Sequence, residues 1–149
     1  MYRRWPSKLP LVVEAFGGLP AFEEVDTGDL RKDLLFMLSK YLDQFNATPL
    51  AVVLPSVVGE RLHNPEFAEL IDPLLRGRRQ PLRRALERGV ERGEISPDVD
   101  LDLAADLIVG PIAVSLFFTG RRVGPAMVAP MVSLALQGIA PGLKARSSD

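Results

Sequence analysis

The stretch LAADLIVGPIAVSLFF, residues 103–118, decides the fold class of this chain. Asp106 and Ser115 carry its only polar side chains, so a helix formed by this stretch is apolar on all sides. The nearly uncharged run over residues 107–120 is shorter than the roughly 20 residues that cross a bilayer comfortably. We therefore expect a buried helix over residues 100–119, and no membrane partner.

The final helix is expected over residues 125–137, and it also carries more apolar side chains than one face can bury. Apolar patches of this size normally mark an interface, so the last two helices predict a homodimer. The alternative is that a helix over residues 65–92 covers them within one subunit, but that helix offers one apolar seam and is rich in arginine. The residues expected in the dimer interface are Leu107, Ile112, Leu116, Met127, Met131 and Leu134.

The remaining periodicity is also helical. Leu34, Leu38 and Tyr41 belong to an apolar face that repeats every three or four residues. Proline and glycine predict a kink near Pro55, and they predict that the helix over 65–92 bends or splits in two. No alternating pattern typical of a strand exceeds about four residues. We therefore predict an all-α bundle of about six helices, over residues 8–16, 29–46, 48–62, 65–92, 100–119 and 125–137.

Residue types that carry catalysis are scarce. The chain has no cysteine and one histidine, so we expect neither a thiol centre nor a multi-histidine metal site. His63 is interpreted as a residue that interacts favourably with the dipole at a helix end. The Glu23-Glu24 pair and the arginines of residues 76–92 are interpreted as solvated surface, and no glycine-rich phosphate loop is present. We expect no enzymatic activity, no metal and no cofactor.

The bulk composition is that of one globular domain. The chain has 149 residues, of which 47% are hydrophobic and 25% charged, with a net charge of −1. This balance excludes a protein that binds nucleic acid over its whole surface, so any basic site must be local. Residues 1–10 lack the apolar core of a signal peptide, and the absence of cysteine fits a cytoplasmic protein.

Proline-kinked helices, aromatic residues and methionines suit a cavity for a small apolar ligand, because kinked helices cannot pack closely along their whole length. The alternative is an ordinary dry core, which composition alone favours. From helical direction, the residues expected to line a cavity are Met37, Tyr41, Leu54, Val58, Leu74 and Phe117.

Two stretches resemble the TetR (tetracycline-repressor-like) family of transcriptional regulators. YRRWPSKLPLVVEAF, residues 2–16, resembles the end of that family's helix-turn-helix. There, a Tyr, an aromatic residue three places on and a Lys that starts the connecting helix correspond to Tyr2, Trp5 and Lys8. ERGEISPDVDLDLAADLIVGPIAVSLFFTG, residues 91–120, resembles the penultimate helix and its entry loop. The resemblance covers nearly the entire chain and implies a C-terminal effector-binding and dimerisation domain, whose last two helices form a four-helix dimer interface.

The resemblance also implies roles for the N-terminal residues. Tyr2 and Lys8 correspond to residues that contact DNA phosphates, and Trp5 corresponds to one that packs in the DNA-binding core. Arg3 and Arg4 are suited to further base or phosphate contacts. Family members have two more helices before this motif, so operator DNA is an expected partner only of a full-length form.

The expected division is therefore a remnant of the DNA-binding region over residues 1–17 and an effector-binding and dimerisation domain over residues 18–149. Two explanations of the short start stay open: a truncation or misplaced initiation codon, and a shortened protein that forms heterodimers. The expected function is that of a ligand-sensing domain, which responds to a small apolar effector, in a dimeric TetR-like repressor. The alternative is a helical dimerisation or interaction module without ligand or DNA binding of its own.

Overall fold

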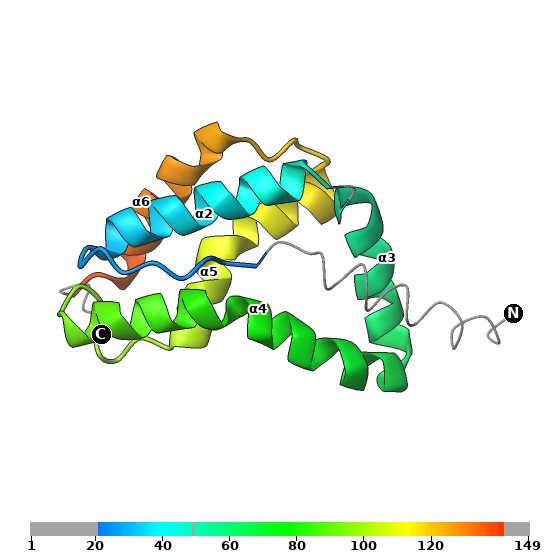
Figure 1. Ribbon diagram of the computed structural model, residues 1–149, viewed down its shortest axis with the longest axis horizontal. Helices are drawn as coiled ribbons and strands as arrows, with labels where there is room; N and C mark the ends of the chain where they lie inside the picture. Colours follow the sequence, from blue (N-terminus) through cyan, green and yellow to red (C-terminus); the bar gives the residue numbers. More distant parts are fainter. Residues whose placement is uncertain (1–20, 49, 142–149) are drawn as a thin grey trace, which may run out of the picture.

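The computed structural model describes residues 21–48 and 50–141, and these ranges contain five α-helices and no strand. The all-α prediction is therefore confirmed (Figure 1). The expected helix over residues 8–16 and the tail over residues 144–149 lie outside the described ranges. The helices are α2 (Leu30–Asn46), α3 (Leu50–His63), α4 (Pro65–Glu91), α5 (Leu101–Val114) and α6 (Val128–Ile139).

Side-chain caps fix where three of these helices begin. Asp29 accepts a hydrogen bond from the backbone N–H of Lys32 at 3.1 Å, and Asn64 accepts one from the N–H of Phe67 at 3.2 Å. Asp100 caps α5 in the same way. The first N–H groups of a helix have no partner inside it, so each cap stabilises its helix by about 1 kcal/mol. The helix starts predicted at these three positions are confirmed.

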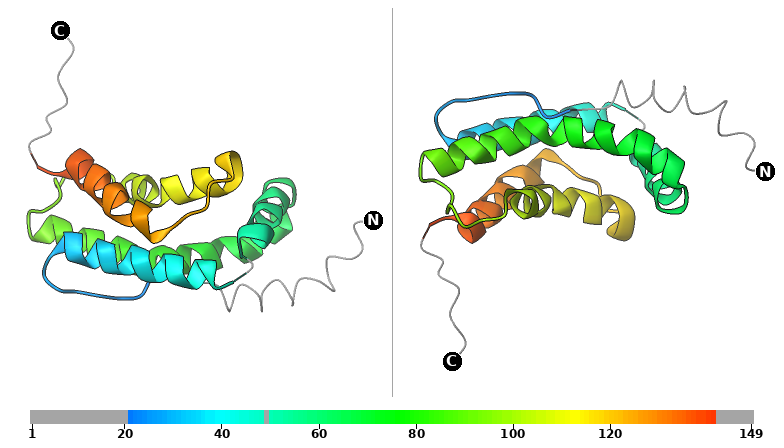
Figure 2. Two further views of the ribbon diagram at one scale, coloured as in Figure 1. Left: turned by 90° about the horizontal axis from the view of Figure 1, so that it is seen from above. Right: turned by 90° about the horizontal axis from the view of Figure 1, so that it is seen from below.

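Helix α4 is one continuous helix of 27 residues, although Pro73 and Pro81 lie inside it. Of the two predicted outcomes, bending and splitting, the structure shows bending, and Figure 2 shows the curve of α4 around the other helices. Each proline removes one backbone hydrogen bond and pushes the preceding turn aside, which bends a helix without ending it when its flanks are packed. Here α4 packs against α2, α3 and α5.

Helix α2 is in contact with α3, α4 and α6 (Figure 1). Its apolar face, predicted from the three- and four-residue spacing, is buried. Burial of a leucine-sized side chain contributes about 1.5–3 kcal/mol, so this face is a main source of stability. The fully buried side chains that meet around it include Leu34, Met37, Leu38, Leu42, Leu82, Leu86, Ile108 and Val132.

Helix α5 is only partly buried within one subunit. The π-helix Ser115–Thr119 continues it, so the apolar helix runs over Leu101–Thr119. By length and composition this helix is able to cross a membrane, which corrects the expectation that it is too short. Only 28% of it is buried, so the expected full burial is not reached within the monomer. Its outer face exposes Leu103, Leu107, Val114 and Phe118.

Two arginines of α4, Arg84 and Arg88, and the C-cap residue Arg92 hold the segment before α2. Arg84 Nη2 lies 2.6 Å from Glu24 Oε2, and Arg88 Nη1 lies 3.1 Å from Glu24 Oε1. Arg92 Nη1 lies 3.3 Å from Asp26 Oδ1. The hydrogen bond from Arg84 keeps the pKa of Glu24 below its usual value. The interpretation of Glu24 and these arginines as merely solvated surface is therefore wrong, because they join two segments about 60 residues apart.

A buried carboxylate holds the same segment on its other side. Asp33, on α2, is fully buried, and its Oδ1 accepts hydrogen bonds from the backbone N–H of Thr27 at 2.8 Å and from its hydroxyl at 2.7 Å. Arg92 Nη2 lies 3.9 Å from Asp33 Oδ2. With both contacts in place, the segment runs along α2 and α4 and carries the buried Phe22 to the cavity described below.

Candidate functional site

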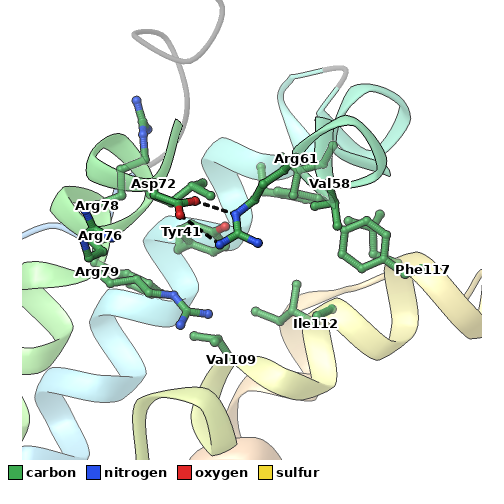
Figure 3. Close-up of a pocket in the computed structure, with 16 residues that line it drawn as sticks. Tyr41, Val58, Arg61, Asp72, Arg76, Arg78, Arg79, Val109, Ile112 and Phe117 are labelled. Carbon is green, nitrogen blue, oxygen red and sulfur yellow. Dashed lines mark hydrogen bonds and ion pairs between the residues drawn. The ribbon is translucent and has the colours of Figure 1, made fainter. Parts of the chain in front are cut away.

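A cavity of about 460 Å³ lies between α2, α3, α4 and the C-terminal half of α5 (Figure 3). Cavities of roughly 300–1,000 Å³ are typical of small-molecule sites. Prolines lie inside three of the surrounding helices: Pro55 in α3, Pro73 and Pro81 in α4, and Pro111 in α5. The π-helix at the end of α5 adds Leu116 and Phe117 to the wall. The structure thus contains a cavity between helices that carry prolines, as the sequence suggested.

One wall of the cavity is aromatic. Phe22 stacks on Tyr41 with ring centroids 4.6 Å apart and planes at 16°, and Tyr41 in turn lies 6.2 Å from the ring of Phe45. Stacked aromatic rings form a flat, rigid apolar surface. On the opposite side, Ile112 and Phe117 come from α5 and its π-helix (Figure 3). This part of the cavity is suited to an apolar body.

The other end of the cavity is polar. Arg61 of α3 donates two hydrogen bonds to Asp72 of α4, from Nε to Oδ1 at 2.5 Å and from Nη2 to Oδ2 at 3.0 Å. This hydrogen bonding keeps the pKa of Asp72 below its usual value and raises the pKa of Arg61. Both groups therefore stay charged near neutral pH, and the bidentate geometry fixes the orientation of the guanidinium plane.

Further guanidinium groups stand at this polar end, on Arg76, Arg78 and Arg79 of α4. Arg79 Nη1 lies 2.6 Å from Asp106 Oδ1 of α5. Burial lowers the pKa of Arg78. Burial also raises the pKa of the Tyr41 hydroxyl, while the positive charges of Arg79 and Arg78 oppose that rise. The ring of Tyr41 is thus part of the aromatic wall, and its hydroxyl lies near the charged end.

Four of the six residues expected to line a cavity do line it: Tyr41, Leu54, Val58 and Phe117. Met37 lies on the buried face of α2 and is part of the core instead. Leu74 is 37% exposed and is not among the lining residues, because it lies on a different face of α4 from Leu75. Arg61 and Asp72 were missed, since nothing in the local sequence pairs two residues on successive helices.

The described residues contain one histidine, His63, and no cysteine. They contain no cluster of three or more acidic or histidine side chains able to hold a metal ion. His63 is exposed at the end of α3, outside the cavity lining, with its Nδ1 2.8 Å from the carbonyl oxygen of Gly59. This position agrees with the helix-end role inferred from the sequence.

A second apolar surface follows the contact between α5 and α6. A groove of about 400 Å³ runs along it, lined on the α6 side by Met127, Met131 and Leu134. Leu107 of α5 lines the groove and is 52% exposed, and Leu134 is 71% exposed. We name this surface the α5–α6 face; it consists of the groove together with the exposed Leu103, Val114 and Phe118.

Four residues expected in the dimer interface, Leu107, Met127, Met131 and Leu134, line this groove. Ile112 and Leu116 line the cavity instead. At 100° per residue, Ile112 is five residues after Leu107 and is therefore rotated from it by about 140° around the helix axis, so Ile112 lies on the inner side of α5.

The residues expected to contact DNA, Tyr2, Arg3, Arg4 and Lys8, lie outside the described ranges.

The chain is similar to known proteins of one family. The sequence profile of the family described as tetracyclin repressor-like, C-terminal domain, matches residues 24–135. Among solved structures, the crystal structure of TetR family transcription regulator SCO0332 is similar, with a TM-score of 0.68 and 30% sequence identity. The match covers 94% of this chain and 79% of that one. A comparison with curated proteins gives no match. Since the family profile spans most of the chain, the resemblance seen in the sequence is confirmed: this protein belongs to the family of tetracyclin repressor-like C-terminal domains.

Proposed function

We propose that this chain is the ligand-sensing, dimerising domain of a TetR-like transcriptional regulator that acts as a repressor in the cytoplasm. The observation that carries the proposal is the cavity of about 460 Å³ with its aromatic wall. A regulator senses a small molecule only if that molecule binds one conformation better than another, and a cavity with an aromatic wall supplies such differential contacts. The proposed role is binding, without catalysis.

The proposed signal starts at Phe22. This residue lines the cavity and belongs to the segment that precedes α2 in the chain. A ligand that presses on the stacked Phe22 and Tyr41 rings favours a different position of that segment. The family resemblance assigns the DNA-binding region to the residues before it. Two recognition helices of a dimer must lie roughly 34 Å apart to enter successive major grooves, so a small tilt of the connection weakens DNA binding.

The proposed dimer is formed by the α5–α6 face of two copies. Phe118 of the π-helix is 83% exposed and Leu134 of α6 is 71% exposed, although both are large apolar residues. Leu103, Leu107, Val114 and Phe118 recur at spacings of four or seven residues, which gives one continuous stripe along α5 and the π-helix that continues it. A second copy brings the same stripe and the same groove, so the surface is self-complementary under twofold symmetry.

A fluorescence titration with the neutral apolar probe N-phenyl-1-naphthylamine tests ligand binding in the cavity. Val58 lines the cavity on α3, so Val58→Trp fills part of it and should abolish saturable binding. Val52 is 78% exposed on the same helix and lies outside the lining, so Val52→Trp is the matched control and should bind like the wild type. Equal binding by both variants would contradict the proposed site.

A further inference from the structure

The polar end of the cavity carries an excess of positive charge. Its lining includes four arginines, Arg61, Arg76, Arg78 and Arg79, and a single acidic residue, Asp72. Arg61, Arg76 and Arg79 alone place three basic groups against two acidic ones, those of Asp72 and of Asp106, which bonds Arg79 from outside the lining. The positive charge is local, because the chain as a whole has a net charge of −1. A purely apolar ligand would make no use of this local positive charge.

Arg61 is already oriented for a second anion. Asp72 accepts from its Nε and Nη2 atoms, and the pair is only partly exposed, at 38% and 26% of the two side chains. A guanidinium has five N–H donors in a fixed plane, so three of them stay available after this bidentate contact. Because Asp72 holds the plane, a ligand that binds Arg61 loses little further side-chain freedom.

Arg79 supplies the second guanidinium. Only its Nη1 atom is engaged by Asp106. Figure 3 shows the head groups of Arg61 and Arg79 directed into the space between α3, α4 and α5, with Ile112 and Phe117 on the far side. Arg78 also lines the cavity, and its positive charge opposes the rise in the pKa of the Tyr41 hydroxyl.

We propose that the effector is an amphipathic organic anion, whose carboxylate binds Arg61 and Arg79 and whose apolar body lies against Phe22, Tyr41 and Phe117. This inference rests on the proposed ligand-sensing function and narrows its ligand class. The aromatic wall and the charged end belong to one cavity, so a single molecule with one ionised end fits both. A free inorganic anion fills only the charged end.

The test compares three ligands with the same ten-carbon chain and different ends: decanoate, decanol and decylamine. Each is titrated below its micelle concentration by isothermal titration calorimetry at 50 mM salt. We expect decanoate to bind at least about tenfold more tightly than decanol, because charge-assisted hydrogen bonds are the stronger class. We expect decylamine to bind most weakly, since its charge has the same sign as the guanidinium groups.

Two variants on one helix face locate the effect. Arg79→Gln removes a cavity guanidinium and its ion pair with Asp106. Arg83→Gln removes the analogous pair with Asp102 one turn further along α4, but Arg83 is not part of the lining. We expect Arg79→Gln to lose the preference for decanoate over decanol while its decanol affinity stays unchanged. We expect Arg83→Gln to keep the wild-type preference.

If Arg79→Gln does not fold, a second variant tests the same preference for an anion. Arg61→Gln combined with Asp72→Asn removes both charges of the pair together and should also abolish the preference for decanoate. Decanoate binding no tighter than decanol, or equal preferences in the Arg79 and Arg83 variants, would overturn the inference and leave the ligand-sensing function standing. If none of the three ligands and not even the neutral naphthylamine probe binds, both the anion inference and the proposed ligand-sensing function are contradicted.

Discussion

Glu94 caps helix α2 from a position 64 residues further along the chain: its Oε2 accepts a hydrogen bond at 2.9 Å from the backbone N–H of Leu30. Leu30 is the first residue of α2, where backbone donors have no partner within the helix. The turn after α4 therefore holds the start of α2, and the same turn is tied to α4 by the hydrogen bond from the backbone N–H of Glu94 to the carbonyl oxygen of Gly89 at 2.8 Å.

Replacing Glu94 by Ala should lower the free energy of unfolding by about 1–2 kcal/mol, the usual effect of losing a helix cap. Glu94→Gln keeps an oxygen that can accept the bond and should recover most of this loss. Glu91, exposed on the preceding turn, gives the control, and Glu91→Ala should change stability little. Urea unfolding curves measure the three variants; equal stability of the Ala variants would exclude the cap as a source of stability.

Two glycines of α4 should respond to alanine in opposite directions. A Cβ on Gly89 would lie 2.8 Å from Leu30 Cδ2 and 3.1 Å from Ile95 Cδ1, both buried side chains with little room to move. Gly89→Ala should therefore destabilise the fold by about 1–3 kcal/mol. Gly77 has nothing within 4 Å of such a Cβ, so Gly77→Ala should stabilise the helix by up to about 1 kcal/mol. Thermal unfolding distinguishes them, and shifts of the same sign would contradict the packing described.

Acidification should weaken the contact of Glu24 with α4. The hydrogen bond from Arg84 lowers the pKa of Glu24 from its ordinary value of 4.5. A carboxyl with a depressed folded-state pKa stabilises the protein above its unfolded pKa, and the effect is lost as the pH falls below it. The melting temperature of Glu24→Gln should thus lie below that of the wild type at pH 6 and approach it below about pH 4. The side chain is half exposed, so the difference should be small and should shrink in 1 M salt.

Assembly through the α5–α6 face predicts a dimer in dilute solution. Leu107→Lys and Leu134→Lys place charges on that face and should give monomers in sedimentation velocity. Val52→Lys changes an equally exposed apolar residue of α3 and should leave the dimer intact. A wild-type monomer that floats with lipid vesicles would instead assign the apolar helix Leu101–Thr119 to a membrane surface.

The fold was largely predictable because its signals are local. Asn64 before Pro65 fixes the start of α4, and the spacing of Leu34 and Leu38 fixes the buried face of α2. Each depends on neighbours within one or two turns. Ile112 shows where this fails: an all-apolar helix has no polar side that tells which residues face inward, so its assignment to the dimer interface had no local support.

The charged groups were less predictable for the same reason. The arginines of α4 form one run in the sequence, but they meet different partners: Arg79 lies at the cavity, Arg83 contacts Asp102, and Arg88 contacts Glu24. These partners come from α5 and from the segment before α2, so only the tertiary arrangement separates the roles. The bidentate Arg61–Asp72 pair joins two helices and is likewise invisible to periodicity.

The central claim is that a small molecule binds between α2, α3, α4 and α5, and hydrogen exchange of the protein with and without N-phenyl-1-naphthylamine tests it most directly. The account predicts slower exchange in peptides that cover residues 38–45, 54–61 and 109–117 and in the segment around Phe22, with little change along α6. Protection confined to the α5–α6 face, or no protection at saturating probe, would contradict it.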